Sequence, residues 1–413
     1  MPIGFAFITI GFLGFGLVRS FDSAFYLLGS VPYTWGSTYS MVVIPLFVLM
    51  GQFAFQSGIS QDLYDTAYKW IGGQPGGIAL ATTAACALFA ACTGSSLASA
   101  ATMGTIAMPE LRRFNYSTRL ATGCVAAGGT LGILIPPSVV FIVYGILTGA
   151  SIGKLFIAGI LPGILITLSF LTLIYARCVL NPKIGPRGPS FQWKERYKSL
   201  LGVGGMLGLF ILIIGGLYFG VFTPTEAGAM GAFGAFIAMA VKGRLTWPAF
   251  VSSVLGTIRT TGMIFMILIG AQVFNGFLTL SGIPAKIALA MGNLPVPGLV
   301  VLIIILLIYI PLGMMMDGLP MILLTLPTLF PIVVDLGFDP IWFGVLICVM
   351  CELANITPPM GMNLYIIKGV SGDQTSIQEV VVGAIPFTIA LLICLAILVA
   401  VPQISLFLPG LMH

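Results

Sequence analysis

The chain has 413 residues, of which 58% are hydrophobic and 7% are charged, and its formal net charge is +5. Soluble domains carry about 25% charged residues, so this composition excludes a water-soluble globular protein and indicates a chain that uses the lipid bilayer as its solvent. The apolar runs are long and do not alternate with polar residues, which favours an all-α polytopic membrane protein over a β-barrel.

The residues that the chain lacks exclude several kinds of chemistry. Its only histidine is His413, the last residue, which excludes a His-based catalytic triad and a histidine metal cluster. No GxxxxGK[ST] loop occurs, so the chain does not hydrolyse ATP through a P-loop. The basic residues lie in short loops, where they set membrane topology, so the net charge does not indicate nucleic-acid binding. We expect no cofactor, and we expect the seven cysteines to be small apolar residues of membrane helices.

Residues 3–18 form a first apolar segment, without the cleavage-site features of a secretory signal peptide, and residues 40–55 form a second. Residues 59–71 mix charged and apolar residues and predict an amphipathic helix at the membrane interface. The following run carries no charge before Glu110, is too long for one span of about 20 residues, and is broken at residues 93–96. We therefore expect a re-entrant helical hairpin that enters and leaves the membrane on one side.

A broken span is predicted over residues 119–154, because the stretch GGTLGILIPPS at residues 128–138 disfavours continuous helix. Residues 155–176 form a clean span. The polar loop at residues 181–199 carries an excess of lysine and arginine, which places it in the cytoplasm. The next span, over residues 200–219, should then run outward.

Residues 226–241 and 250–280 predict two further spans, and Glu226 should cap the start of the first of them. A second re-entrant hairpin is predicted over residues 299–331, with a break at residues 313–318. The flank after this hairpin carries acidic residues and no basic ones, so it should lie outside the cell.

A broken span over residues 341–368 and a last span over residues 380–401 complete the chain. The segments together make nine crossings and two hairpins, with the N-terminus inside and the C-terminus outside, and this arrangement satisfies the positive-inside rule.

Two halves of the chain share an internal repeat. Pro109 and Pro331 end the two hairpins, and the Pro-Pro pairs at 136–137 and 358–359 follow them at the same offset of 222 residues. A Ser-Gly-Ile triplet also precedes each hairpin, at nearly the same offset. The predicted topology starts the first copy outside and the second inside, so the repeats are inverted, as in secondary transporters with discontinuous helices.

The breaks have the chemistry of ion and anion sites. The first hairpin tip reads CTGSSLASA at residues 92–100, and its hydroxyl and carbonyl oxygens suit sodium, while its N–H groups at a helix start suit a carboxylate. The second half offers LGMMMDGLP at residues 312–320 and CELANITPPMG at residues 351–361. At the offset of 222, Asp317 takes the place of Ser95, and Thr357 takes the place of Ile135.

Three charged residues within apolar segments need interpretation. Asp317 is a candidate functional residue, because an acid inside the membrane is costly. Glu352 is either functional or a structural acceptor for freed N–H groups. Arg259 is expected to pair or to reach toward the interface, rather than to bind substrate.

At GSSLASA, LGILIPPS and ITPPMGMN the chain resembles the large membrane subunit of tripartite ATP-independent periplasmic (TRAP) transporters. The resemblance extends over nearly the whole chain. It implies an elevator-type transporter of the bacterial inner membrane that couples uptake of an organic acid, such as a C4-dicarboxylate or sialic acid, to sodium. It also implies two partners, a small four-helix membrane subunit and a periplasmic substrate-binding protein.

Carried onto this sequence, the resemblance assigns two sodium sites and a substrate site between the hairpin tips. The first sodium site would use Gly94, Ser95, Ser96, Gly129, Gly132 and Ile135. The second would use Met315, Asp317, Gly318, Asn355, Thr357 and Gly361. The substrate would contact Ser95, Ser96, Asp317 and Thr357.

The resemblance also divides the chain into units. Members of the family carry more apolar sequence before the Pro-Ile-Gly at residues 2–4, so we expect the first helix to be truncated or to be fused to the small subunit. The units are residues 1–75 (scaffold helices and first arm helix), 76–150 (first transport half), 151–296 (scaffold helices, cytoplasmic loop and second arm helix), 297–370 (second transport half) and 371–413 (last scaffold helix).

Three other functions compete with this interpretation. A stand-alone sodium/carboxylate symporter would share the hairpins but need no binding protein. An intramembrane enzyme could use Asp317 and Glu352 as a carboxylate pair, although no nucleophile with a base is evident. A channel is the third, but two hairpins that close a site at the midplane suit alternating access better than an open pore.

Overall fold

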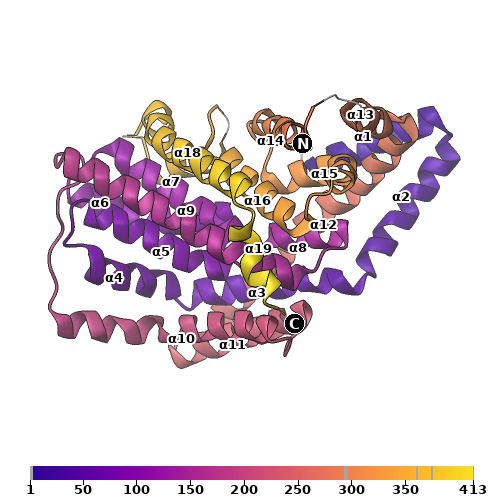
Figure 1. The fold of residues 1–413 in the computed structure, drawn as a ribbon. Helices are drawn as coiled ribbons and strands as arrows, with labels where there is room; N and C mark the ends of the chain where they lie inside the picture. Colours follow the sequence, from indigo (N-terminus) through magenta and orange to yellow (C-terminus); the bar gives the residue numbers. More distant parts are fainter. Residues whose placement is uncertain (1–2, 293–295, 360, 374, 413) are drawn as a thin grey trace.

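The computed structural model describes residues 3–292, 296–359, 361–373 and 375–412, so Pro2 and His413 lie outside the described residues. The described residues form helices and connecting turns with no β-strand, which confirms the all-α prediction (Figure 1). In chain order the helices are α1 (Ile3–Val18), α2 (Phe21–Gly36), α3 (Val43–Gln56), α4 (Ile59–Ile71), α5 (Gly77–Thr93), α6 (Ser96–Arg113), α7 (Thr118–Leu134), α8 (Val139–Thr148), α9 (Ile152–Leu180), α10 (Trp193–Tyr218), α11 (Pro224–Val241), α12 (Trp247–Ser281), α13 (Ile283–Gly292), α14 (Gly298–Gly313), α15 (Gly318–Asp335), α16 (Pro340–Ile356), α17 (Met362–Ser371), α18 (Ile377–Ala400) and α19 (Gln403–Gly410).

The N-terminal helix packs closely along the long helix α12. A Cβ atom at Gly4 would lie 2.7 Å from the carbonyl oxygen of Met266, and one at Gly11 would lie 2.6 Å from the backbone nitrogen of Phe274. Glycine at these positions lets the two backbones approach, which is how helices gain dispersion contacts in a bilayer where apolar burial contributes little.

Two helices were not predicted from the sequence. α2 runs along the outer edge of the molecule and contains Pro32, and it begins at Ser20, whose side chain accepts a hydrogen bond from the Ser23 amide (Figure 1). α19 follows α18 after a short turn near the C-terminus. Both mix polar residues or proline with apolar ones, so hydropathy alone did not separate them from loops.

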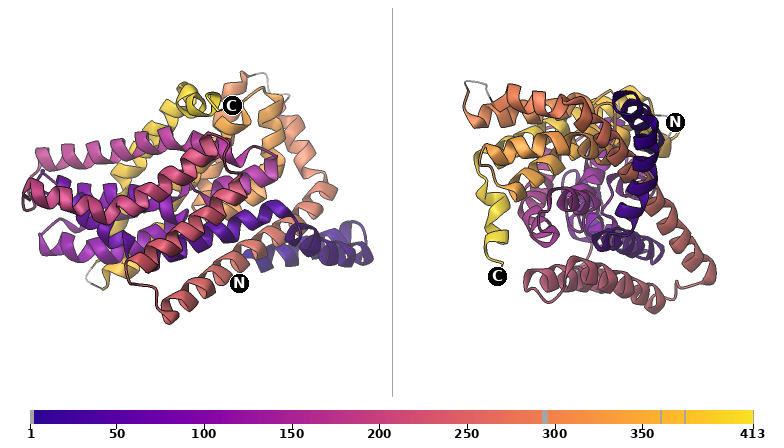
Figure 2. Two further views of the ribbon diagram at one scale, coloured as in Figure 1. Left: turned by 90° about the horizontal axis from the view of Figure 1, so that it is seen from below. Right: turned by 90° about the vertical axis from the view of Figure 1, so that its right-hand side faces the viewer.

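The predicted cytoplasmic loop is shorter than expected. α9 continues to Leu180, and α10 begins at Trp193, so the predicted loop over residues 181–199 is wrong after residue 192. Gln192 and Glu195 form a capping box that starts α10, which explains how a charged segment becomes its first turn. α10 and α11 form a separate layer below the other helices (Figures 1 and 2).

The two predicted hairpins and their tips are present as helix–turn–helix units. α5 and α6 turn at Gly94 and Ser95, and α14 and α15 turn over residues 314–317. In the second hairpin, the hydroxyls of Tyr309 and Thr325 are 2.6 Å apart and link the two helices.

The two predicted breaks are shorter than the sequence indicated. α7 is continuous to Leu134 and the chain leaves the helix over residues 135–138, while α16 is continuous to Ile356 before the second break. The glycines at 128, 129 and 132 therefore stay helical. Their role is packing, because a Cβ at Gly129 would lie 2.6 Å from the Cβ of Ala100 in the first hairpin.

The internal repeat extends to the backbone of the two arm helices. The glycines that precede α4 and α13, Gly58 and Gly282, both adopt the left-handed conformation, with φ of 72° and 68°. Both Pro-Pro bonds are cis. Glu226 also caps α11 as predicted. It forms a capping box with Thr223: the Thr223 hydroxyl accepts from the Glu226 amide, and the Glu226 carboxylate accepts from the Thr223 amide.

Eight helices of the described chain are long and apolar enough to cross a membrane. They include all but two of the predicted crossings, since α1 and α16 have only 16 and 17 residues. α15, the second helix of the second hairpin, has the length and hydropathy of a span. The number of crossings and the re-entrance of the hairpins therefore stay predictions.

Candidate functional site

Both hairpin tips line one cavity of about 410 Å³, which we call the tip cavity. Ser95 and Ser96 come from the first tip and Asp317 and Gly318 from the second. The remaining walls are formed by residues of α3, α5, α7, α8 and α12, including Gln52 of α3. Two segments that are more than 200 residues apart in sequence thus meet at one place, as the family resemblance implied.

The first tip presents the start of helix α6 to this cavity. Ser95 is the N-cap of α6, and its hydroxyl accepts a hydrogen bond from the Ala98 amide at 3.4 Å. The hydroxyls of Thr93 and Ser99 are 2.7 Å apart and join the two sides of the turn. The arrangement combines oxygen atoms with the N–H groups of a helix start, and those N–H groups favour an anion.

The first tip is pressed against the first broken helix. Gly94 has φ of 57°, and a Cβ atom there would lie 2.7 Å from the carbonyl oxygen of Pro137. At Gly132, a Cβ atom would lie 2.8 Å from the carbonyl oxygen of Ser95 and 2.9 Å from the Ser99 hydroxyl. Four predicted residues of the first sodium site, Gly94, Ser95, Ser96 and Gly132, therefore lie at or against one turn.

A hydrogen-bonded link that the sequence reasoning missed joins this tip to the other half of the chain. Asn363 of α17 donates through Nδ2 to the Ser96 hydroxyl at 2.8 Å and to the Ala126 carbonyl at 3.0 Å. Both Asn363 and Ser96 are buried. The signal was present in ITPPMGMN, where Asn363 is a polar residue four positions after the double proline, but it was read only as family resemblance.

The second tip mirrors the first with an acid in place of a hydroxyl. Asp317 is the N-cap of α15, although its side chain makes no capping hydrogen bond, and it is half-buried at the cavity wall. The Asn355 side chain lies beside the Asp317 carboxylate, and its Nδ2 makes no hydrogen bond of good geometry to the described residues. Asp317 and Asn355 thus come together, as predicted for the second sodium site.

Glycines bring the second tip and the second break against α16. A Cβ at Gly318 would lie 2.8 Å from the Cβ of Cys351, and one at Gly361 would lie 2.7 Å from the carbonyl oxygen of Asn355. The backbones of tip and break therefore approach the same stretch of α16, where carbonyl oxygens are concentrated.

Seven predicted site residues do not line the tip cavity, namely Gly129, Gly132, Ile135, Met315, Asn355, Thr357 and Gly361. Met315 is 75% exposed at the end of the second hairpin. Thr357 is buried, does not line the cavity, and donates its hydroxyl to the Leu353 carbonyl. Ile135 points into a different cavity. Backbone contributions of these residues to ion sites stay predictions, but the Thr357 side chain is already engaged within its own helix.

Glu352 is fully buried, and neither carboxyl oxygen has a hydrogen-bond partner among the described residues. It therefore does not accept the freed N–H groups that one interpretation of the sequence assigned to it. Cys348, one turn earlier, donates to the Ile133 carbonyl of α7 at 3.1 Å, which places this face of α16 toward the first broken helix.

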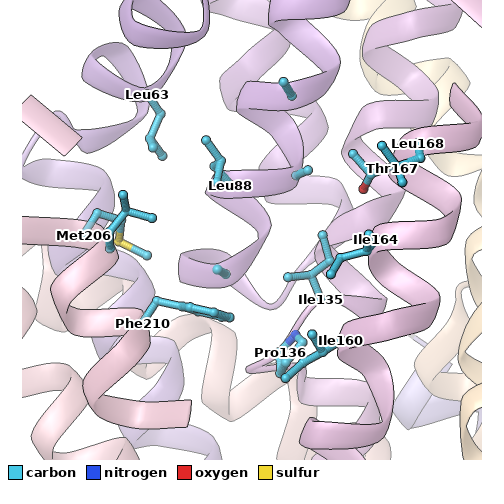
Figure 3. Close-up of a pocket in the computed structure, with 14 residues that line it drawn as sticks. Leu63, Leu88, Ile135, Pro136, Ile160, Ile164, Thr167, Leu168, Met206 and Phe210 are labelled. Atoms are coloured by element: carbon cyan, nitrogen blue, oxygen red, sulfur yellow. The ribbon is translucent and has the colours of Figure 1, made fainter. Parts of the chain in front are cut away.

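A second cavity, of about 420 Å³, lies between α5 and the helices α9 and α10. Figure 3 shows Leu88, Ile135, Ile164 and Phe210 converging on it. Among the described residues that line it, only Thr167 has a side-chain oxygen or nitrogen, and its hydroxyl donates to the Gly163 carbonyl at 2.7 Å. The described walls of this cavity are apolar, and they offer no charged side chain to a carboxylate or an ion.

The comparisons with known proteins agree with this architecture. The family model described as "Tripartite ATP-independent periplasmic transporter, DctM component" matches residues 1–404. The chain is 37% identical over 375 residues, 90% of this chain and 86% of the relative, to the C4-dicarboxylate TRAP transporter large permease protein DctM of Pseudomonas aeruginosa.

Two further comparisons extend the match. The chain is 33% identical, over 89% of its own length and 86% of the relative, to the 2,3-diketo-L-gulonate TRAP transporter large permease protein YiaN of Escherichia coli. Among solved structures, the YdaH transporter of Alcanivorax borkumensis matches over 100% of both chains with a TM-score of 0.72 and 16% sequence identity, which shows a common fold.

Proposed function

Because the chain belongs to the DctM family of large permease subunits of TRAP transporters, we propose that it imports an organic acid across the bacterial inner membrane in symport with sodium. The observation that carries the proposal is the tip cavity, where the start of α6 and the start of α15 meet. The substrate carboxylate binds at the α6 start, where backbone N–H groups are available and Ser95 lines the cavity; the Ser96 hydroxyl is already bound to Asn363.

The substrate class follows from the relatives and from this chemistry. Relatives are named for C4-dicarboxylates, 2,3-diketo-L-gulonate and sialic acid, which carry a carboxylate, and one is named for isethionate, which carries a sulfonate instead. Ser95, Ser96 and Asp317 contact the acid or the ions that accompany it. The structure supports Thr357 less, because its hydroxyl is bound within α16.

Sodium binds at the two places where a tip meets a broken helix. At the first, the carbonyl of Ser95 faces Gly132, and the break begins at Ile135. At the second, the Asp317 carboxylate lies beside Asn355, and the Asn355 carbonyl faces Gly361. Carbonyl, hydroxyl and carboxylate oxygens at unwound helix ends are the ligands that sodium finds in such transporters. Sodium bound there offsets the negative charge of Asp317 before a carboxylate arrives.

Transport proceeds by an elevator movement of the two hairpins and broken helices against the remaining helices. The supporting observation is the difference between the two kinds of contact. The tips are tied to the broken helices by hydrogen bonds and close backbone packing, and an apolar cavity lies between α5 and the helices α9 and α10, although α9 also packs closely on α7 at Gly159. The hairpins are re-entrant in this proposal.

Two partner proteins complete the proposed transporter. A small four-helix membrane subunit packs on the permease, and a periplasmic binding protein delivers the acid. Support comes from relatives named as single permease proteins, DctMQ of Oleidesulfovibrio alaskensis and SiaT of Haemophilus influenzae, of which this chain covers 60% and 66%. The unmatched part of those relatives has room for a second component.

Uptake into proteoliposomes tests the proposal. The permease and its small partner are reconstituted, and radiolabelled C4-dicarboxylates and sialic acid are added outside with the binding protein, with and without an inward sodium gradient. We expect uptake that requires both the gradient and the binding protein. Sodium-driven uptake without the binding protein would instead favour a stand-alone symporter, and uptake that ignores sodium would contradict the coupling.

A further inference from the structure

A single cation lies in the membrane-spanning part of α12. Arg259 is the only lysine or arginine between Arg244 and Lys286. Its side chain is exposed and forms no ion pair with another described residue. An arginine in a membrane helix without an internal partner is costly, so its position indicates a role outside the packing of this chain.

The helix geometry places Arg259 at the edge of the tip cavity. Thr260 and Met263 of α12 line the cavity. Gly256, one turn earlier, lies against Gln52, which lines the cavity from α3. Residues three and four apart in a helix share a face, so Arg259 lies on the face that runs from Gly256 to Met263. Met263 is 57% exposed, which puts this face at the cavity mouth.

The described lining of the tip cavity contains an acidic residue but no basic one, and Arg259 can supply a positive charge beside it. Among the described residues that line it, Asp317 is the only charged one. A carboxylate that enters the cavity meets the negative charge of Asp317 beside the helix starts of the tips. A guanidinium at the rim reverses the local potential, and it matches a carboxylate with two parallel hydrogen bonds.

We infer that Arg259 is an anion-binding residue, which holds the substrate carboxylate at the cavity mouth as the acid passes between the mouth and the tips; this differs from the expectation from the sequence that Arg259 does not bind substrate. This inference rests on the proposed function, since it assumes a carboxylate substrate. Arg259 belongs to the helix that also packs against α1, so it would act from the fixed side of the cavity while the tips move.

The first test measures the potential at the mouth without any transport. Met263→Cys is labelled with a negatively charged and a positively charged thiosulfonate reagent of similar size, in the presence and absence of Arg259→Gln. The seven native cysteines are buried, so the parent chain gives the background. Charged clefts change encounter rates by tenfold or more, so we expect Arg259→Gln to lower the ratio of anionic to cationic labelling about tenfold. An unchanged ratio would overturn the inference.

The matched control is Lys286→Gln, another exposed cation that lies on the arm helix α13 and not on the cavity face of α12. It should leave the labelling ratio at Met263→Cys unchanged. An equal fall in the ratio with Lys286→Gln would mean that net charge, not position, sets the potential, and would also overturn the inference.

The second test measures binding of a labelled C4-dicarboxylate to the purified permease complex in saturating sodium. We expect Arg259→Gln to weaken binding about tenfold and Arg259→Lys to weaken it less, because lysine keeps the charge but loses the planar fork. Unchanged affinity in Arg259→Gln, with a wild type that binds, would overturn the inference while leaving the proposed function intact. If wild type binds no organic acid, the proposed function fails, and the labelling ratio still decides whether Arg259 makes the mouth attractive to anions.

Discussion

Ser96 and Asn363 are 267 residues apart in sequence and are joined by a buried hydrogen bond of 2.8 Å. Ser96 begins the second helix of the first hairpin, and Asn363 lies in the first turn of α17, just after the second break. The same amide also donates to the Ala126 carbonyl of α7. One side chain thus connects the hairpin of one half, the broken helix of that half and the broken helix of the other.

Replacing this link should loosen the first tip. Asn363→Ala leaves the Ser96 hydroxyl and the Ala126 carbonyl without their donor, and a lost buried hydrogen bond costs about 1–3 kcal/mol. We expect a lower midpoint of thermal unfolding in detergent. In a double-mutant cycle with Ser96→Ala, the coupling should be on the order of 0.5–2 kcal/mol, the range found for such bonds in membrane proteins. Additive effects of the two changes would mean that the contact contributes nothing.

A methyl group at Gly132 should displace the first tip. The Cβ of Gly132→Ala would lie 2.8 Å from the Ser95 carbonyl and 2.9 Å from the Ser99 hydroxyl, closer than real Cβ atoms tolerate. The tip must then move from the position that the first sodium site needs. We expect the sodium concentration that gives half of the maximal rise in the thermal unfolding midpoint to increase at least tenfold.

The control for that variant is Gly208→Ala in α10, where a Cβ atom meets nothing within 4 Å. Alanine is the better helix former by about 0.5–1 kcal/mol, so this change should leave stability equal or raised and the sodium dependence unaltered. Equal loss of sodium affinity in both variants would show that helix packing at large, and not the Ser95 contact, controls the site.

Asp317→Asn tests the second sodium site. The variant keeps the size of the side chain at the start of α15 and removes the only charge among the described lining residues of the tip cavity. We expect the sodium affinity, measured by thermal stabilisation, to fall by tenfold or more, because one carboxylate ligand is lost. Asp335→Asn, at the exposed end of the same helix, should change nothing. Retained sodium affinity in Asp317→Asn would exclude Asp317 as a ligand.

Glu352→Gln should be well tolerated. The carboxyl oxygens of Glu352 have no hydrogen-bond partner among the described residues, and an unpaired ionised group in such a place would be very costly. A neutral amide of the same shape avoids that cost, so we expect its unfolding free energy to stay within about 1 kcal/mol of wild type. Glu352→Lys should prevent stable folding, because no buried acid faces the new cation. A large loss of unfolding free energy in Glu352→Gln would contradict this expectation. It would indicate that the Glu352 carboxylate pairs with a positively charged residue in another conformation of the protein.

An ion pair anchors the arm helix α4. We expect its loss to change the stability of the protein only slightly but to slow uptake severalfold. Lys242, just after α11, binds the Asp62 carboxylate and also lies 3.4 Å from the Gly202 carbonyl. The two side chains are 25% and 35% exposed, so solvent weakens the attraction, and Lys242→Ala should cost about 0.2–1 kcal/mol of stability. If the arm guides the moving hairpin, uptake should slow severalfold. The double exchange Asp62→Lys with Lys242→Asp should restore the rate of uptake. If it does not, the slower uptake of Lys242→Ala is not caused by loss of the ion pair.

Most of the helices and both hairpin tips could be predicted from the sequence. Local signals were sufficient there, because long charge-free runs require helices in lipid and because Gly94, with φ of 57°, stands where the chain must turn. The offset of 222 residues also placed Asp317 opposite Ser95, and the structure makes both the N-cap of the second helix of a hairpin.

Other features depended on tertiary contacts. Gly129 and Gly132 were expected to interrupt α7, but each is helical and admits the first hairpin to the helix surface. The propensity of glycine to leave a helix is overridden when close packing and satisfied backbone hydrogen bonds favour helix. α2 and the start of α10 were missed for a related reason, since capping at Ser20 and Gln192 sets these helices rather than apolar periodicity.

The sequence by itself determined that this chain spans the membrane, that it contains two related halves, and which turns carry the polar groups, because each of these follows from composition and local spacing. Only the tertiary structure decided that the two tips share one cavity, that Asn363 ties the halves together, and that Thr260 and Met263 of α12 line the same cavity. These relations join residues from helices far apart in the chain, and close packing of whole helices, not any local preference, brings them together.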